Sequence, residues 1–195
     1  MLVYRDLEYV INGHERQKLD LYLPDAGENR PLIIWVHGGA FRVGSKEGNE
    51  NDPLPLQYLS QGYAVASLNY RLSQHAIWPA QIEDCKAAVR WLRARSAEYK
   101  LDPNRFGAWG PSAGGHLVAL LGTLDVPSDE ATPSRVQAVC DWYGPSDLLT
   151  MPPNVLSPGK TEADLAKANG AQLLGGIVRD RPELAVQPAR PFEAR

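Results

Sequence analysis

AWGPSAGGHLVALL, residues 108–121, places a serine between glycines, after an apolar run and before residues with helical spacing. Gly110 to Gly114 fit the pattern G-x-S-x-G, in which the serine lies at the apex of a sharp turn from a strand into a helix. That turn leaves room only for glycine two residues before and two residues after the serine. The N–H groups and the dipole of the following helix favour negative charge at this point. The stretch therefore predicts that Ser112 is a nucleophile at the end of a buried strand.

The segments around this turn alternate between two kinds of pattern. Continuous apolar runs at 31–39, 63–72, 105–110 and 136–144 predict strands that are buried on both faces. Apolar residues recur at helical spacing from Pro79 to about Lys100, and again after Ser112. Strands that alternate with helices predict an α/β fold, a mostly parallel sheet with helices on both faces.

Other segments carry weaker local signals. Runs at 7–11 and 18–24 flank a polar turn and predict a hairpin. Residues 40–55 are expected to form a long loop, and residues 102–104 a turn. Residues 161–176 are expected to be helical, opened by a Thr-x-x-Asp cap. The last stretch, 181–195, is rich in proline and predicts irregular structure.

The length and charge of the chain exclude several classes of protein. A chain of 195 residues predicts a single domain, 1–195. The net charge of −3 comes from interspersed acids and bases, so no basic tract indicates nucleic acid or an anionic membrane as a partner. No apolar run approaches the ~18 residues of a membrane span, and the N-terminus lacks the apolar core of a secretory signal. A cytoplasmic location is the expectation.

The cysteines and histidines give no sign of a metal site. Cys85 and Cys140 each lie in an apolar segment, so two reduced core cysteines are expected rather than a disulfide. The four histidines are scattered along the chain, without the spacing of zinc ligands. We therefore expect neither a metal nor a cofactor.

A second motif, HGGAF at residues 37–41, directly follows the apolar run IIWV. Glycines here let backbone N–H groups approach a substrate oxygen with no side chain in the way. Two or three such donors form an oxyanion hole, and each contributes about 2.7–4 kcal/mol in comparable enzymes. Both motifs follow parallel strands, where open α/β sheets bind their ligands.

Together these motifs resemble a known family. HGGAF, NYRLSQHAIWPAQIEDCKAAVRWLR, WGPSAGGH and DWYGPSDLL, in this order, are similar to the α/β-hydrolase fold, within its acetyl esterase/lipase branch related to hormone-sensitive lipase and to bacterial feruloyl and acetyl-xylan esterases. The resemblance runs from about residue 18 to the C-terminus. It implies Ser112 as nucleophile and the N–H groups of Gly38, Gly39 and Ala113 as the oxyanion hole. It also implies a small-molecule substrate, a short-chain acyl or aromatic ester, and no cofactor. Pro111 stands where members close to hormone-sensitive lipase carry Asp, which favours the acetyl and feruloyl esterases.

The base and the acid that would activate Ser112 have no clear counterpart. In this fold the chain order is Ser, then acid, then His, yet no histidine follows His116. The resemblance therefore implies a fold that is truncated after about the sixth strand. His75 is a candidate base, although a solvated loop histidine is the ordinary alternative. Asp147 is a candidate acid, although capping of the next turn is favoured.

The remaining polar residues of this region have structural interpretations. Arg71 and Asp84 are expected to form an ion pair. His37 and His116 are expected to pack or to hydrogen-bond with the backbone. Cys85 has no activating neighbour in the sequence, so a core position is favoured over a nucleophile.

Two functions stay open on the sequence alone. The first is a serine ester hydrolase, and the alternative is a catalytically impaired or non-catalytic α/β-hydrolase fragment that acts in binding or assembly. The strand at 136–144 would lie at the edge of a truncated sheet, with no lysine or proline to protect it. A homodimer or larger oligomer is therefore expected, with residues 136–150 and 161–176 near its interface.

Overall fold

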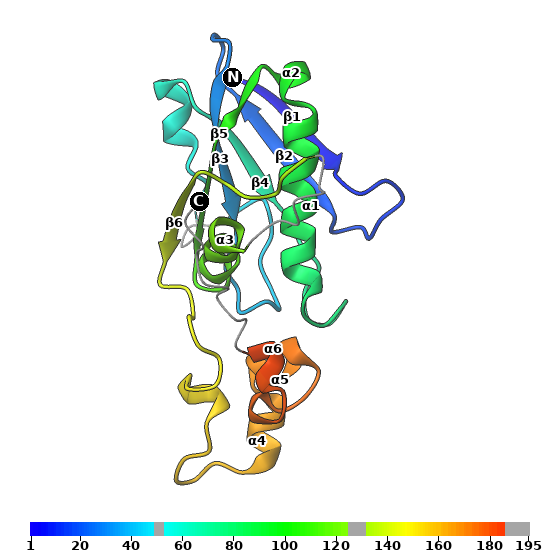
Figure 1. Cartoon of the computed structure of the whole chain (residues 1–195), viewed down its shortest axis with the longest axis vertical. Coiled ribbons are helices and arrows are strands. Elements are labelled where there is room, and N and C mark those ends of the chain that lie inside the picture. The colour runs from blue at the N-terminus through cyan, green and yellow to red at the C-terminus, as the bar shows by residue number, and fades with distance from the viewer. Residues whose placement is uncertain (49–52, 125–131, 186–195) are drawn as a thin grey trace, which may run out of the picture.

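The computed structural model describes residues 1–48, 53–124 and 132–185. Its centre is a six-stranded sheet in the order β1-β2-β4-β3-β5-β6 (Figure 1). Strands β4, β3, β5 and β6 are parallel to one another. Strand β2 runs antiparallel to both of its neighbours, β1 and β4. The strands are β1 Leu2–Glu8, β2 Lys18–Leu23, β3 Arg30–Val36, β4 Ala64–Leu68, β5 Leu101–Pro111 and β6 Ala138–Trp142. The mostly parallel sheet predicted from the sequence is confirmed.

Two helices cover one face of this sheet, α1 at Ala80–Ala94 and α3 at Ala113–Thr123 (Figure 1). Helix α1 buries Ile82, Cys85, Val89 and Leu92, the residues whose spacing predicted it. On the other face, the 3-10 helix η1 at Leu56–Gln61 brings the ring of Tyr58 to 5.8 Å from that of Trp109. Both faces of the central strands are therefore packed, as their apolar runs require.

The residues after β6 lie beyond the carboxyl ends of the parallel strands (Figure 1). Their elements are η2 Pro152–Asn154, α4 Glu162–Lys167, α5 Asn169–Leu174, η3 Val178–Asp180 and α6 Pro182–Ala185. The backbone N–H of Trp78 donates to the carbonyl of Leu173 at 2.8 Å, which joins this segment to the loop before α1. Thr161 and Asp164 form the predicted capping box at the start of α4.

Several predicted boundaries are wrong. The first strand is Leu2–Glu8 rather than 7–11, and its register shifts between Tyr4 and Leu7, where Asp6 has a φ of 54°. Residues 102–104 lie within β5, where the N–H of Asn104 still donates to the Asp102 carboxylate at 2.9 Å. The predicted turn is therefore a local irregularity of the strand.

Two predicted helices are interrupted, and one predicted core residue is not buried. Arg95 separates α1 from α2 (Ser96–Tyr99), and the extended Ala168 separates α4 from α5. Cys140 is exposed, because β6 is the outermost strand and its side chains lie at the surface. Both cysteines are free thiols, and Cys85 is buried as expected. The predictions for residues 49–52 and 186–195 lie outside the described residues.

The order of the strands makes β3 a switch point of the sheet. From β3 the chain crosses to β4 on one side and then to β5 on the other side of β3. The segments that leave the carboxyl ends of β3 and β5 consequently diverge, and such a point is where open α/β sheets bind their ligands. The HGGAF motif follows β3, and Ser112 follows β5, so the topology places both motifs at this point of the sheet. No helix in the described ranges is long and apolar enough to cross a bilayer.

Candidate active site

Ser112 forms the turn between β5 and α3, with φ of 52° and ψ of −121°. A non-glycine residue rarely adopts a positive φ, and such strain persists only where the surroundings impose it. The backbone N–H of Ser112 donates to the carbonyl of Trp142 at 2.7 Å, and its carbonyl accepts from the N–H of His116 at 3.1 Å. The sharp strand-to-helix turn predicted from G-x-S-x-G is therefore present.

The two glycines of the pattern allow β3 to pack against this turn. A Cβ atom on Gly110 would lie 2.5 Å from the carbonyl oxygen of Val36, and one on Gly114 only 2.0 Å from the same oxygen. Only glycine fits at either position, because a Cβ atom at such a distance would overlap the oxygen. This packing fixes the end of β3 beside Ser112.

We call residues 37–44 the oxyanion loop, after the role that the resemblance implied for Gly38 and Gly39. Gly39, Ala40 and Phe41 all have positive φ angles, of 106°, 54° and 61°. The carbonyl of Gly39 accepts hydrogen bonds from the N–H groups of Arg42 and Val43, at 2.9 and 3.0 Å. These two bonds close a tight turn directly after β3.

The oxyanion loop lies against the serine. A Cβ atom on Gly38 would be 3.6 Å from the Cβ of Ser112 and 3.0 Å from the carbonyl oxygen of Pro111. Ala113 is the first residue of α3, where backbone N–H groups have no partner within the helix. Gly38 and Ala113, two of the three residues that the resemblance implied for an oxyanion hole, therefore lie beside Ser112, and Gly39 follows Gly38 in the same loop.

His37 is buried at the base of the oxyanion loop. Its Nδ1 lies 2.6 Å from the carbonyl oxygen of Gly38, and its ring stacks on Tyr70 with 4.4 Å between centroids. Burial lowers the pKa of His37 to about 4, so the ring is neutral at physiological pH. The expectation of packing and backbone hydrogen bonding is confirmed for this residue.

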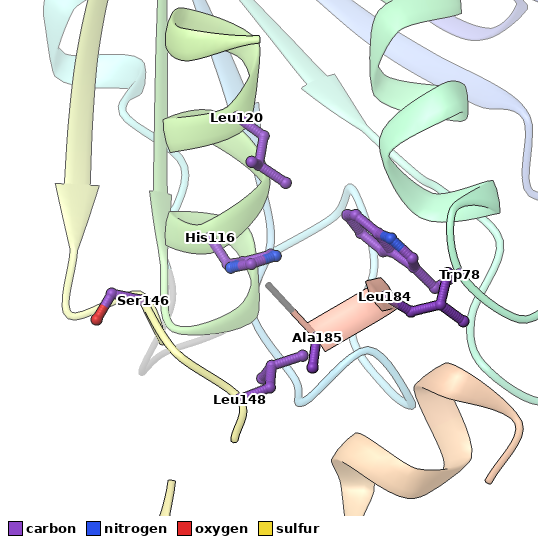
Figure 2. Close-up of a pocket in the computed structure, with 7 residues that line it drawn as sticks. All are labelled: Trp78, His116, Leu120, Ser146, Leu148, Leu184 and Ala185. Carbon is purple, nitrogen blue, oxygen red and sulfur yellow. The ribbon is translucent and has the colours of Figure 1, made fainter. Parts of the chain in front are cut away.

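His116 lies one helical turn after Ser112, and its Nδ1 is 2.7 Å from the carbonyl oxygen of Pro145. Burial lowers the pKa of His116 below its usual value. Its ring borders a cavity of about 70 Å³, across from Trp78, with 5.7 Å between the ring centroids. Figure 2 shows that this cavity lies between α3 and the segment after β6, lined by Trp78, His116, Leu120, Ser146, Leu148, Leu184 and Ala185.

The candidate base and acid make local contacts. His75 is exposed in the loop after β4, where its Nδ1 accepts the N–H of Leu72 at 3.1 Å and its ring lies 4.7 Å from that of His14. Asp147 accepts the N–H of Leu149 at 2.8 Å and the hydroxyl of Thr150 at 2.9 Å. These two bonds lower the pKa of Asp147, and they are those of a turn cap.

Two further findings concern the polar residues near the site. The carboxylate of Asp84, which is 1% exposed, accepts hydrogen bonds from the guanidinium of Arg71 at 2.7 and 2.9 Å, which confirms the predicted ion pair. It also accepts one from the side-chain amide of Gln17 at 2.6 Å. All four histidines lie in the described ranges, and within these ranges none is hydrogen-bonded to the Ser112 hydroxyl. The same residues contain no group of His, Cys, Asp or Glu that could hold a metal ion.

Arg16 also lies at this site, although its sequence pattern does not predict a role for it. It lies in the turn between β1 and β2, yet its Nη2 reaches Nε2 of His37 at 3.2 Å. Nothing in its sequence neighbourhood, a polar turn, distinguishes it from a solvated arginine.

The chain is similar to known esterases. Residues 19–193 match the family described as BD-FAE. Esterase LipQ of Mycobacterium tuberculosis is 36% identical over 151 residues, which cover 73% of this chain and 35% of LipQ. The probable carboxylic ester hydrolase LipM of the same bacterium is 35% identical over 126 residues, which cover 62% of this chain and 29% of LipM. The chain spans about a third of the length of these two relatives.

A solved structure is similar over nearly the whole chain. It is described as a truncated form of a carbohydrate esterase from gut microbiota. The TM-score is 0.80 at 32% sequence identity, and the match covers 95% of this chain and 70% of the other. The sheet order and this similarity together identify the α/β-hydrolase fold, as the sequence motifs predicted.

Proposed function

Because this chain belongs to the BD-FAE family, we propose that it is a carboxylic ester hydrolase that uses Ser112 as its nucleophile. One observation carries this proposal. Ser112 stands at a strained turn with a φ of 52°, and Gly38 of the oxyanion loop lies beside it, since a Cβ atom on Gly38 would be 3.6 Å from the Cβ of Ser112. A serine held in this way, beside backbone donors and at the start of a helix, is arranged for acyl transfer.

In the proposed reaction, the Ser112 Oγ attacks the ester carbonyl carbon and loses its proton to a base. The carbonyl oxygen becomes an oxyanion, which accepts hydrogen bonds from the N–H groups of Gly38, Gly39 and Ala113. The alcohol leaves with a proton, and the acyl group stays on Ser112. Water then attacks this acyl-enzyme and releases the carboxylic acid and free Ser112.

We propose small acyl groups, acetyl or aromatic acyl, as the part of the substrate that is transferred. Both relatives have names that refer to esters, and the similar solved structure is named a carbohydrate esterase. No cofactor is part of this proposal.

The candidate base and acid make other contacts. His75 and Asp147 stay the candidates, but the contacts of His75 are with Leu72 and His14, and those of Asp147 are with its own turn. The alternative function, a catalytically impaired fragment that acts in binding or assembly, is favoured by the absence of a hydrogen bond from any histidine to Ser112 within the described residues.

A covalent probe separates the two functions. A fluorophosphonate should label the chain, and peptide mapping should locate the adduct on Ser112. Ser112→Ala is the matched control and should abolish labelling. If labelling persists in Ser112→Ala, the assignment of the nucleophile is wrong. If the wild-type chain is not labelled at all, the non-catalytic alternative holds.

We also propose that two copies of the chain associate through β6. This strand is exposed along its whole length, and Val139 and Trp142 are 40% and 45% exposed. The segment 161–176 has less support as an interface, because Leu165, Leu173 and Leu174 are buried within the chain itself. The cytoplasmic location also stays a prediction.

A further inference from the structure

The ring of His37 connects the oxyanion loop to the turn between β1 and β2. On one edge of the ring, Nε2 lies 3.2 Å from Nη2 of Arg16. On the other edge, Nδ1 lies 2.6 Å from the carbonyl oxygen of Gly38. The ring itself is 1% exposed and stacks on Tyr70. His37 is therefore held on three sides.

These contacts fix the proton on one nitrogen. A guanidinium group can only donate hydrogen bonds, so Nε2 must accept from Arg16 and carries no proton. A carbonyl oxygen can only accept, so Nδ1 carries the proton and donates it to Gly38. Both contacts require the same neutral tautomer. A second proton on the ring would place an N–H group of His37 against the N–H of Arg16.

Arg16 is itself fixed by several acceptors. Its Nε donates to the carbonyl of Tyr70 at 2.8 Å, and its Nη2 donates to the carbonyl of Gly44 at 2.9 Å. The side-chain oxygen of Asn69 lies 3.3 Å from the same Nη2. These acceptors come from the end of the oxyanion loop and from the segment after β4, so the guanidinium has one position.

Gly44 covers the hydrogen bond between His37 and Gly38. A Cβ atom on Gly44 would lie 2.5 Å from Nδ1 of His37 and 2.7 Å from the carbonyl oxygen of Gly38. The backbone of the oxyanion loop therefore folds back over this bond, and water has no room beside it. A short hydrogen bond shielded from water holds the orientation of the Gly38 carbonyl.

The orientation of this carbonyl decides where the next N–H group points. In a trans peptide the C=O and the following N–H point in opposite directions. Since the Gly38 carbonyl points to His37, the N–H of Gly39 points away from it. Within the described ranges, no acceptor takes a hydrogen bond from this N–H.

We propose that Arg16 is a positioning residue for the oxyanion hole: by holding His37 as the Nδ1–H tautomer, it keeps the Gly38 carbonyl turned inward and the Gly39 N–H directed at the substrate oxyanion. This inference rests on the proposed ester hydrolysis. Arg16 does not touch the substrate, since it acts through His37. Its removal leaves the Gly38 peptide free to turn, which would withdraw one donor from the oxyanion.

The tautomer of His37 is measured directly by ¹⁵N NMR of histidine-labelled protein. The wild-type ring should show a protonated Nδ1, a bare Nε2 and a pKa of about 4. Arg16 and Glu47 are the charged groups that act on this ring, Arg16 lowering its pKa and Glu47 raising it. In Arg16→Met the Nε2–H tautomer should become populated and the pKa of His37 should rise. Arg95→Gln is the matched control, because Arg95 lies over Trp91 on α1 and should leave the His37 signals unchanged.

The rate of fluorophosphonate labelling at Ser112 is the second measurement. Loss of one oxyanion donor costs about 10²–10³ in rate, so partial misalignment in Arg16→Met should slow labelling about tenfold or more, with little change in probe affinity. Arg16→Lys, which restores one donor, should recover part of the rate, and it replaces Arg16→Met if that variant fails to fold. An unchanged tautomer, or a changed tautomer with an unchanged labelling rate, overturns the proposal. A wild-type chain that is not labelled overturns the ester hydrolysis, while the tautomer measurement still reports whether Arg16 fixes His37.

Discussion

Gly114 and Val36 lie so close that a Cβ atom on Gly114 would be 2.0 Å from the Val36 carbonyl oxygen. This contact joins the end of β3, from which the oxyanion loop leaves, to the first turn of α3, which follows Ser112. Ser112, the proposed nucleophile, and the oxyanion loop are therefore positioned by one shared backbone contact, and the geometry of both depends on a residue with no side chain.

The first prediction concerns this contact. Gly114→Ala should destabilise the protein by about 1–3 kcal/mol, because the added methyl group meets backbone that cannot move away. Gly122→Ala on the same helix is the control, since its Cβ would lie 2.5 Å from Cγ2 of Val139, an exposed side chain that can rotate away, and not against backbone. Gly122→Ala should change the free energy of unfolding by less than about 1 kcal/mol, because the helix propensity of alanine offsets the displacement of Val139. Urea unfolding measures both, and equal destabilisation of the two variants would contradict the prediction.

The second prediction concerns the ion pair between Arg71 and Asp84. Asp84 is 1% exposed, so Asp84→Asn leaves the Arg71 guanidinium without its counter-charge in a poorly solvated position. The free energy of unfolding should fall by about 3 kcal/mol. Glu28→Gln, which removes an exposed pair with Lys100, should cost less than about 1 kcal/mol. If Asp84→Asn lowers the free energy of unfolding no more than Glu28→Gln does, the charge of Asp84 does not contribute to stability as predicted.

The third prediction follows from the pKa of His37, which is about 4 in the folded protein against an ordinary value of 6.5. As the pH falls below 6.5, His37 binds a proton in the unfolded chain but stays neutral in the folded protein. Stability should therefore fall between pH 6.5 and pH 4, by on the order of 3 kcal/mol from this residue, and level off below pH 4. Urea unfolding at several pH values measures this slope.

Two variants assign that slope to His37. His37→Asn keeps an N–H donor near the position of Nδ1 and removes the titrating ring, so its stability should depend less on pH in this range. His75→Gln removes an exposed histidine and should retain most of the wild-type slope. A slope that is the same in His37→Asn and in the wild type would refute the assignment.

The fourth prediction concerns turnover. Within the described residues no histidine is hydrogen-bonded to Ser112, so hydrolysis of p-nitrophenyl acetate by this chain should be slow but measurable. Serine hydrolases without an intact triad keep roughly 10³–10⁴-fold catalysis over water from the oxyanion hole and binding. The butyrate ester should react more slowly than the acetate. A turnover number of several per second would show that some residue acts as base, and a loss of that rate in His75→Gln would identify it.

The fifth prediction concerns assembly. An exposed edge strand with Val139 and Trp142 at its surface favours pairing with a second copy. Light scattering behind a sizing column should give a mass of about twice 21.5 kDa or more at micromolar concentration. Val139→Lys, which places a charge on the edge, should shift the mass toward the monomer. A clean monomer for the wild-type chain would refute the prediction.

The sequence predicted the turn at Ser112 and the oxyanion loop, because the backbone geometry of these segments requires particular residue types. A strained turn with close backbone contacts needs glycine at positions 110 and 114, and both glycines are visible in the sequence. The parallel strands were predicted for a similar reason, since burial on both faces requires an unbroken apolar run.

Other features do not require a particular residue type at a particular position, so the sequence did not predict them. Arg16 reaches His37 across 21 residues of chain, and this contact depends on how the first hairpin folds beside the sheet. Cys140 lies in an apolar segment and was expected in the core, but its burial depends on the position of β6 in the sheet. The start of β1 was missed because a register shift at Asp6 breaks the alternation by which a strand is recognised.

The cavity beside His116 also gives the protein an internal optical reporter. Among the five tryptophans, Trp78 is the one that lines this cavity, and its indole lies 5.7 Å from the imidazole of His116. Its backbone N–H is hydrogen-bonded to the carbonyl of Leu173, and Leu184 lines the same cavity (Figure 2). Its fluorescence would respond to an acyl group that enters the cavity, to protonation of His116, and to any detachment of the segment after β6 from the body of the protein.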